Sequence, residues 1–276
     1  ALSGSCGVPL PPLARKTAFA GLAHTENMSM KTWFGAVMLI DVYCLHAPGP
    51  LDTANLVSMC GATVNILNKF DGDKFGASRV ALTNCMPQLA TALRSIGFSA
   101  NDATKESVAA MEIKLLEVLK WQINLPTMES WLSAFCKRLD ALTSAACSTQ
   151  IGCVLQQCLF VAYQLVLLRA SLVDVPPRRM ACGLFCIILV SVGILPLETL
   201  RPPDLQPGTC WRPRALLEVA VGAEFTQLQE DFDVVAALLE NHALPSYGVG
   251  GLTSRRNAPQ PAEVVDDQAS RLHEMS

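Results

Sequence analysis

The sequence predicts an all-α protein, and three observations support this fold class. Over residues 108–127 the apolar side chains recur at helical spacing, with Val108, Met111 and Leu115 on one face. Similar segments elsewhere are separated by proline and glycine, which end helices. Half of the 276 residues are hydrophobic, which allows a sizeable core and excludes disorder for most of the chain. We therefore expect helices packed into bundles.

Four helices are expected before the helix at 108–127. They cover residues 13–23, 33–45, 56–70 and 84–96. The segment Pro48-Gly-Pro50 breaks the chain after the second, and Gly72 is expected to cap the third. Residues 99–102, Ser-Ala-Asn-Asp, supply cap chemistry for the helix at 108–127, and Pro126 ends that helix.

The second half of the chain is predicted to be helical as well. Thr127 can cap a helix at 128–142, Pro176 suits the first turn of another, and residues 225–241 are again amphipathic. Residues 198–213 are punctuated by proline. Residues 1–12 are expected to form an arm and residues 245–276 a disordered tail.

Two apolar runs leave a membrane protein open as an alternative. Residues 141–168 and 180–197 contain no charged side chain, so spans near 147–168 and 180–197 satisfy the length of a bilayer. Against this, the first run holds four glutamines, and neither run has an aromatic belt. We therefore expect core helices of a soluble protein without membrane contact.

Composition excludes several functional classes. The net charge of −3 and the lack of a long basic block argue against nucleic-acid binding. Eleven cysteines scattered through apolar runs indicate reduced core residues inside the cell, and no signal peptide is evident. No paired CxxC occurs, and the four histidines fall in expected loops or tails. We expect no enzyme activity, metal, cofactor or small-molecule substrate.

One charged residue stands out inside an apolar helix. Asp41 lies within residues 33–45, which are otherwise apolar on all sides. An ionised carboxylate buried there requires a cation, because an unpaired buried charge is costly. The nearest preceding candidates are Arg15, Lys16 and Lys31.

Residue order adds a resemblance to a known family. The stretch M-E-I-K-L-L-E-V-L-K-W-Q-I-N-L-P-T, followed by M-E-S-W-L-S-A-F, resembles the end of the first cyclin box and the start of the second, most closely in the G1 (D-type) cyclins. L-A-R-K-T-A-F-A-G-L is similar to an eroded form of the signature that opens the first box. G-A-V-M-L-I-D-V-Y-C-L is similar to its second helix, and V-P-P-R-R-M-A-C-G to a central helix of the second box.

The resemblance implies two tandem five-helix cyclin-box bundles. The first box would cover residues 13–126 and the second, cyclin-box-like bundle residues 127–244. It also implies a buried ion pair between Arg15 and Asp41. The connection at residues 73–100 and the insertion at 198–213 are longer than the family usually has.

The implied function is that of a regulatory subunit, in the nucleus or cytoplasm, that binds and activates a cyclin-dependent protein kinase. The residues that match the kinase contact of the family are Lys69, Phe70, Glu112, Leu116, Trp121 and Ile123. A cyclin-fold scaffold that binds partners without activating a kinase is the nearest alternative. A cyclin-fold transcription-initiation factor would be basic and preceded by a zinc ribbon, whereas this chain is acidic and has no CxxC pair.

Some cyclins recruit substrates that carry an Arg-x-Leu motif through a groove on the opening helix. The matching positions here are Ala14, Thr17, Ala18 and Gly21, which offer little apolar surface. We therefore expect no measurable binding of an Arg-x-Leu peptide.

Overall fold

The computed structural model describes residues 10–25, 28–47, 52–70, 78–168, 175–200 and 212–241. These residues form helices and no strand, so the all-α prediction is confirmed for them. The expected cap at Gly72 and most of the predicted arm, the 198–213 insertion and the tail lie outside the described residues.

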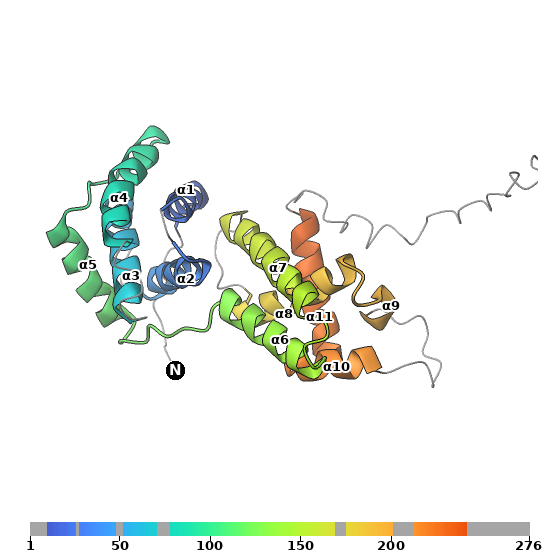
Figure 1. The fold of residues 1–276 in the computed structure, drawn as a ribbon. Coiled ribbons are helices and arrows are strands. Elements are labelled where there is room, and N and C mark those ends of the chain that lie inside the picture. Colours follow the sequence, from blue (N-terminus) through green and yellow to red (C-terminus); the bar gives the residue numbers. More distant parts are fainter. Residues whose placement is uncertain are drawn as a thin grey trace, which may run out of the picture.

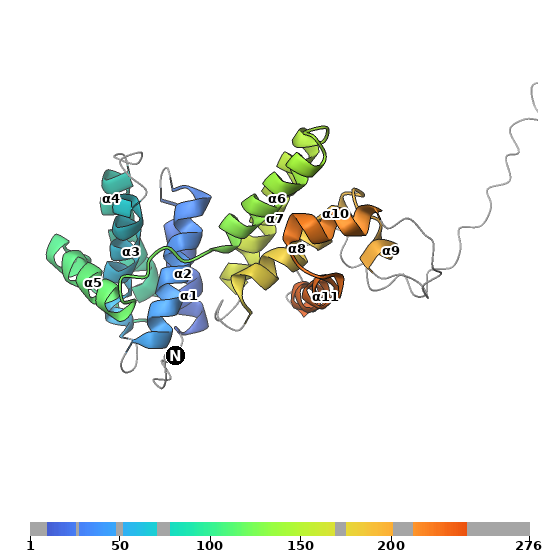
Figure 2. The same cartoon turned by 90° about the horizontal axis from the view of Figure 1, so that it is seen from below.

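The helices form two groups, which Figures 1 and 2 show side by side. The first contains α1 (Pro12–Ala23), α2 (Met30–His46), the short 3₁₀ helix η1 (Thr53–Asn55), α3 (Leu56–Phe70), α4 (Ser78–Ser95) and α5 (Lys105–Val118). The second contains α6 (Met128–Leu142), α7 (Ser148–Leu168), α8 (Pro177–Ser191), α9 (Leu197–Leu200), α10 (Arg212–Val221) and α11 (Phe225–Asn241). An extended segment between α5 and α6 connects them (Figure 2).

Each group is built around one central helix. In the first, α3 contacts α1, α2, α4 and α5. In the second, α8 lies against α6, α7 and α11, and every side chain from Met180 to Leu189 is buried. Gly183 permits the approach of α11, because a Cβ there would lie 2.3 Å from the carbonyl oxygen of Asp231. The apolar segment that forms α8 is therefore explained by burial on all sides.

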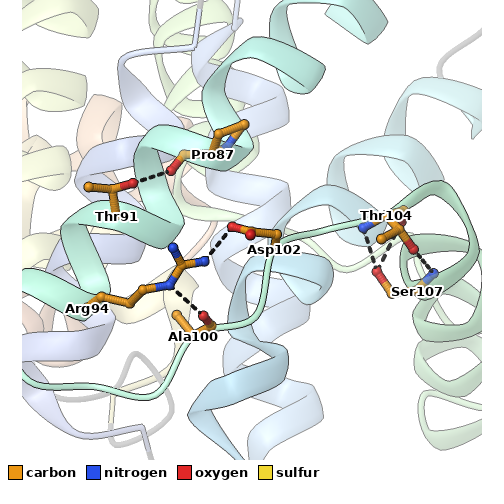
Figure 3. Close-up of polar contacts among 7 residues, drawn as sticks. All are labelled: Pro87, Thr91, Arg94, Ala100, Asp102, Thr104 and Ser107. Atoms are coloured by element: carbon orange, nitrogen blue, oxygen red, sulfur yellow. Dashed lines mark hydrogen bonds and ion pairs between the residues drawn. The ribbon is translucent and has the colours of Figure 1, made fainter.

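The predicted helix at 108–127 is shorter and starts earlier in the structure. It begins after Thr104, whose side chain accepts a hydrogen bond from the amide of Ser107, and this reciprocal capping box replaces the cap expected at residues 99–102 (Figure 3). Asp102 instead pairs with Arg94 of α4, whose Nε also donates to the carbonyl of Ala100 at 2.9 Å. The linker residues thus fasten α4 to the start of α5.

Helix α4 extends further than the sequence indicated. It starts at Ser78 rather than near residue 84, and it contains Pro87 in its interior. Proline lacks the amide that the helix ladder uses, so it weakens the helical signal in the sequence. Thr91, one turn after Pro87, donates a hydrogen bond from its Oγ1 to the Pro87 carbonyl oxygen at 2.9 Å (Figure 3).

The two uncharged runs differ in the structure. Helix α7 is long and apolar enough to cross a membrane by length and composition, with 39% of its most apolar window buried within the protein. Helix α8 ends at Ser191, before a turn at Gly193, and its apolar side chains are used inside the second group. Among the described residues, the second run therefore forms a core helix rather than a span.

Candidate functional site

Two of the residues predicted for the kinase contact meet between α3 and α5, and the others lie on these helices or just after α5. Helix α3 ends in Lys69 and Phe70, and its earlier residues are almost all buried. The Lys69 ammonium pairs with the Glu112 carboxylate on α5. The Lys69 side chain is 57% exposed and that of Glu112 14%. We call the surface formed by Lys69, Phe70, Glu112, Leu116, Trp121 and Ile123 the α3–α5 face.

The packing of α5 on α3 explains this placement. Met111 and Leu115 of α5 are buried, while Val108 lies against Gly61 of α3. The hydroxyl groups of Ser58 and Ser107 form a hydrogen bond of 2.9 Å between the two helices. Glu112 follows Met111 at 100° around the helix, so it comes to the edge of the contact, within reach of the end of α3.

The apolar residues of the α3–α5 face differ in their exposure to solvent. Phe70 is 62% exposed and Trp121 is 71% exposed. Leu116 and Ile123 are partly buried and pack against the core. Ile113, which sequence analysis did not select, is also exposed and lies one turn before Leu116 on α5. Its exposure follows from how α5 packs on α3, so the sequence alone does not distinguish Ile113 from a core residue.

A left-handed turn carries Trp121. Lys120 and Trp121 have φ values of 51° and 62°, a region that residues other than glycine rarely adopt. The amide of Trp121 donates to the carbonyl of Leu116 at 2.9 Å, and that of Lys120 to Glu117 at 3.1 Å. These bonds close α5 at Val118 in a Schellman motif. Trp121 and Ile123 therefore lie beyond the end of α5, although the sequence predicted a helix over residues 108–127.

Arg15 and Asp41 form the second predicted pair, deep inside the protein. Arg15 Nε and Nη2 donate to the two Asp41 carboxylate oxygens at 3.0 and 2.7 Å, and both residues are buried. Arg15 Nη1 also donates to the carbonyl of Val166 on α7. The Arg15 guanidinium lies 4.5 Å from the Phe19 ring centroid. This pair therefore connects α1, α2 and α7 across the junction of the two helical groups.

A groove of about 520 Å³ lies between α1 and α4. Thr17 and Gly21, two of the positions expected to lack a substrate groove, line it, whereas Ala14 and Ala18 are completely buried. A Cβ on Gly21 would lie 2.9 Å from Leu89 Cδ1, so α4 approaches α1 closely here. The groove also carries Lys16 and His24, and no acidic side chain occurs among its described lining residues, which disfavours a basic Arg-x-Leu peptide.

The cysteines of the described residues are free thiols. Burial raises the pKa of Cys136 to about 12. Burial, and then the carboxylate of Asp41, raise the pKa of Cys44 to about 12. Such thiols stay protonated at neutral pH and are poor nucleophiles. Within the described part of the chain, no group of three His, Cys, Asp or Glu side chains could hold a metal ion.

Comparison with known proteins adds no relative. No family model matches the chain, and no curated protein matches it. A functional conclusion therefore rests on the residues themselves, above all on the α3–α5 face.

Proposed function

We propose that this chain is a non-catalytic regulatory subunit that binds and activates a cyclin-dependent protein kinase in the nucleus or cytoplasm. In this proposal the two helical groups are tandem cyclin boxes. The α3–α5 face docks on the mobile helix of the kinase and holds it in the active position. The observation that carries the proposal is the Lys69–Glu112 pair between α3 and α5, together with two exposed aromatic residues, Phe70 next to Lys69 in the chain and Trp121 just after α5.

The physical argument is that of an interface hot spot. Large aromatic side chains supply the apolar area that a partner buries, and tryptophan is enriched among anchors of this kind. The Lys69–Glu112 pair is worth at most about 1 kcal/mol to the stability of the free chain, because water screens it. It therefore exchanges its internal contact for backbone groups of a partner helix at little cost.

Capture and activation of a kinase test this proposal. The full chain is mixed with each of a panel of purified cyclin-dependent kinases, and complex formation and phosphorylation of a substrate are measured. We expect one kinase to bind and to gain activity. Capture without activation would instead indicate a cyclin-fold scaffold, and failure to bind any kinase would overturn the proposal.

A helical membrane protein is the second candidate, and the length and apolar character of α7 favour it. One side of α7 packs on α1, α6 and α8, which speaks for a core helix. Alkaline extraction of membranes separates the two candidates. We expect the folded chain in the supernatant without detergent, and retention in the pellet would favour a span at α7.

A further inference from the structure

Two arginines of the second helical group lack a carboxylate partner among the described residues. Ion pairs occupy the other arginines whose side chains the structure describes: Arg15 with Asp41, Arg94 with Asp102, Arg179 with Asp231, and Arg214 with Glu218. The two exceptions are Arg138 of α6 and Arg178 of α8, both exposed. Both arginines lie next to the same residue, Gly222.

Both guanidinium groups adjoin Gly222, the residue that follows α10. Arg178 Nη2 donates to the Gly222 carbonyl oxygen at 2.6 Å, and its guanidinium lies 5.5 Å from the Trp131 ring centroid. Arg138 Nη1 lies 3.3 Å from the position that a Cβ on Gly222 would occupy. Gly222 has a φ of +68°, so the chain turns there without placing a side chain against Arg138.

Two acidic residues lie near Gly222 in the chain. The carboxylate of Glu218, on the preceding turn of α10, accepts hydrogen bonds from Arg214 and from the amide of Phe225. Glu224 is exposed on the same loop. Arg138 and Arg178 both adjoin Gly222, so two positive charges are close there, and each guanidinium keeps N–H donors that are open to a ligand. A compact dianion with several acceptor oxygens relieves both conditions.

We propose that the junction of α6, α8 and α10 binds a phosphorylated side chain of a partner protein through Arg138 and Arg178. Leu142, one turn after Arg138, and Val219, one turn before Gly222, are exposed and offer apolar contacts to flanking residues of that partner. A single pair of arginines suits one phosphate group. An acidic chain without a long basic block does not suit a polyanion such as nucleic acid or an anionic membrane. The site lies in the second helical group, so it is independent of the α3–α5 face.

A binding titration with the full chain tests the site. The probe is a fluorescent five-residue peptide with a central phosphoserine between valine and leucine, and the comparison is the same peptide without phosphate. We expect the phosphorylated form to bind at least about tenfold more tightly, since one charge-assisted hydrogen bond is worth about that factor. Inorganic phosphate should compete with it. Equal affinity of the two peptides would overturn the proposal.

Three variants locate the binding. Arg138→Gln should remove most of the preference for phosphate, and Arg178→Lys, which keeps the charge and loses the planar fork, should weaken it. Lys137→Gln removes the same charge from the neighbouring exposed position of α6 and should leave the preference unchanged. An equal loss in Lys137→Gln and Arg138→Gln would overturn the site in favour of non-specific attraction.

A lipid-binding assay tests whether the site binds a phosphorylated lipid headgroup instead of a phosphorylated protein. Vesicles that contain a phosphatidylinositol phosphate should not retain the wild-type chain on flotation. Retention on these vesicles without a preference for the phosphopeptide would contradict a protein partner. Circular dichroism melts of each variant check that the second helical group remains folded, and Arg178→Lys is used because Arg178 also covers Trp131.

Discussion

The protein contains two acid–base pairs whose chemistry is the same and whose surroundings are opposite. Arg15 and Asp41 have side-chain exposures of 0% and 4% at the junction of the two helical groups. Lys69 and Glu112 lie at the outer edge of α3 and α5, where Lys69 is largely in water. A buried pair is costly to break because one charge stays behind without a partner, whereas an exposed pair is cheap to break. The Arg15–Asp41 pair therefore stabilises the fold, whereas the Lys69–Glu112 pair can be opened by a binding partner at little cost.

The largest effect is expected at the buried pair. Arg15→Ala should lower the free energy of unfolding by about 3–5 kcal/mol, because Asp41 is left charged and buried and Val166 loses its donor. Urea denaturation measures the loss. The control is Lys16→Ala, an exposed basic residue at the next position of α1. A similar loss in both variants would contradict the special role of the pair.

The rate at which Cys44 is alkylated reports on whether the buried Arg15–Asp41 pair is intact. Cys44 is buried one turn after Asp41, and its raised pKa of about 12 keeps the thiol protonated at assay pH. Cys153 is exposed on α7. At about pH 8 an alkylating reagent should therefore modify Cys153 quickly and Cys44 slowly, since the thiolate is the reactive form. Arg15→Ala removes a charge that lowers the pKa of Cys44, so faster modification of Cys44 in this variant would come from opening of the junction. We expect this acceleration, and an unchanged or slower rate would contradict a weakened junction.

The next largest effect concerns the aromatic residues of the α3–α5 face. Under the proposed function, Trp121→Ala or Phe70→Ala should weaken kinase binding by about 2 kcal/mol or more, roughly 30-fold, while stability changes little. Calorimetric titration with the kinase measures the loss. Ile194→Ala removes an exposed apolar side chain of the second helical group and should bind as wild type does. Equal weakening in Ile194→Ala would show that the effect is not specific to the face.

A smaller effect is expected from the turn that carries Trp121. Lys120→Gly should raise the free energy of unfolding by up to about 1 kcal/mol, because glycine adopts a positive φ without the steric cost of a Cβ. Ser144→Gly, at the equivalent position after α6, should give a similar gain. Lys114→Gly, inside α5, should instead cost about 1 kcal/mol. A loss in Lys120→Gly as large as in Lys114→Gly would contradict the turn.

Much of the fold could be predicted where a helix has an unambiguous start and stop. Thr127 caps α6 as expected, and the bounds of α3, α6 and α11 match the predicted segments. A buried cation near Asp41 could be predicted because an acid in an apolar helix needs one, but the choice of Arg15 over Lys16 and Lys31 came from the resemblance to cyclins. The end of α5 could not be predicted, since Lys120 occupies a left-handed position where the sequence offers no glycine. The start of α4 at Ser78 could not be predicted, because Pro87 weakens the helical pattern of the sequence. The exposure of Ile113 and the presence of the α1–α4 groove could not be predicted either, because both depend on which sides of the helices pack together.

The most direct test of the proposed function is the double variant Lys69→Ala/Glu112→Ala. Its stability should stay within about 1 kcal/mol of wild type, because the Lys69 side of the pair is in contact with water. Its matched control, Lys114→Ala/Glu117→Ala, removes the same two charges from exposed positions of α5 that lie outside the α3–α5 face. Activation of the kinase is titrated against the concentration of each variant. We expect the double variant to need at least about 30-fold more protein than wild type, and the control to match wild type. A well-folded double variant that activates its kinase at wild-type concentration would contradict the assignment of the α3–α5 face as the kinase interface.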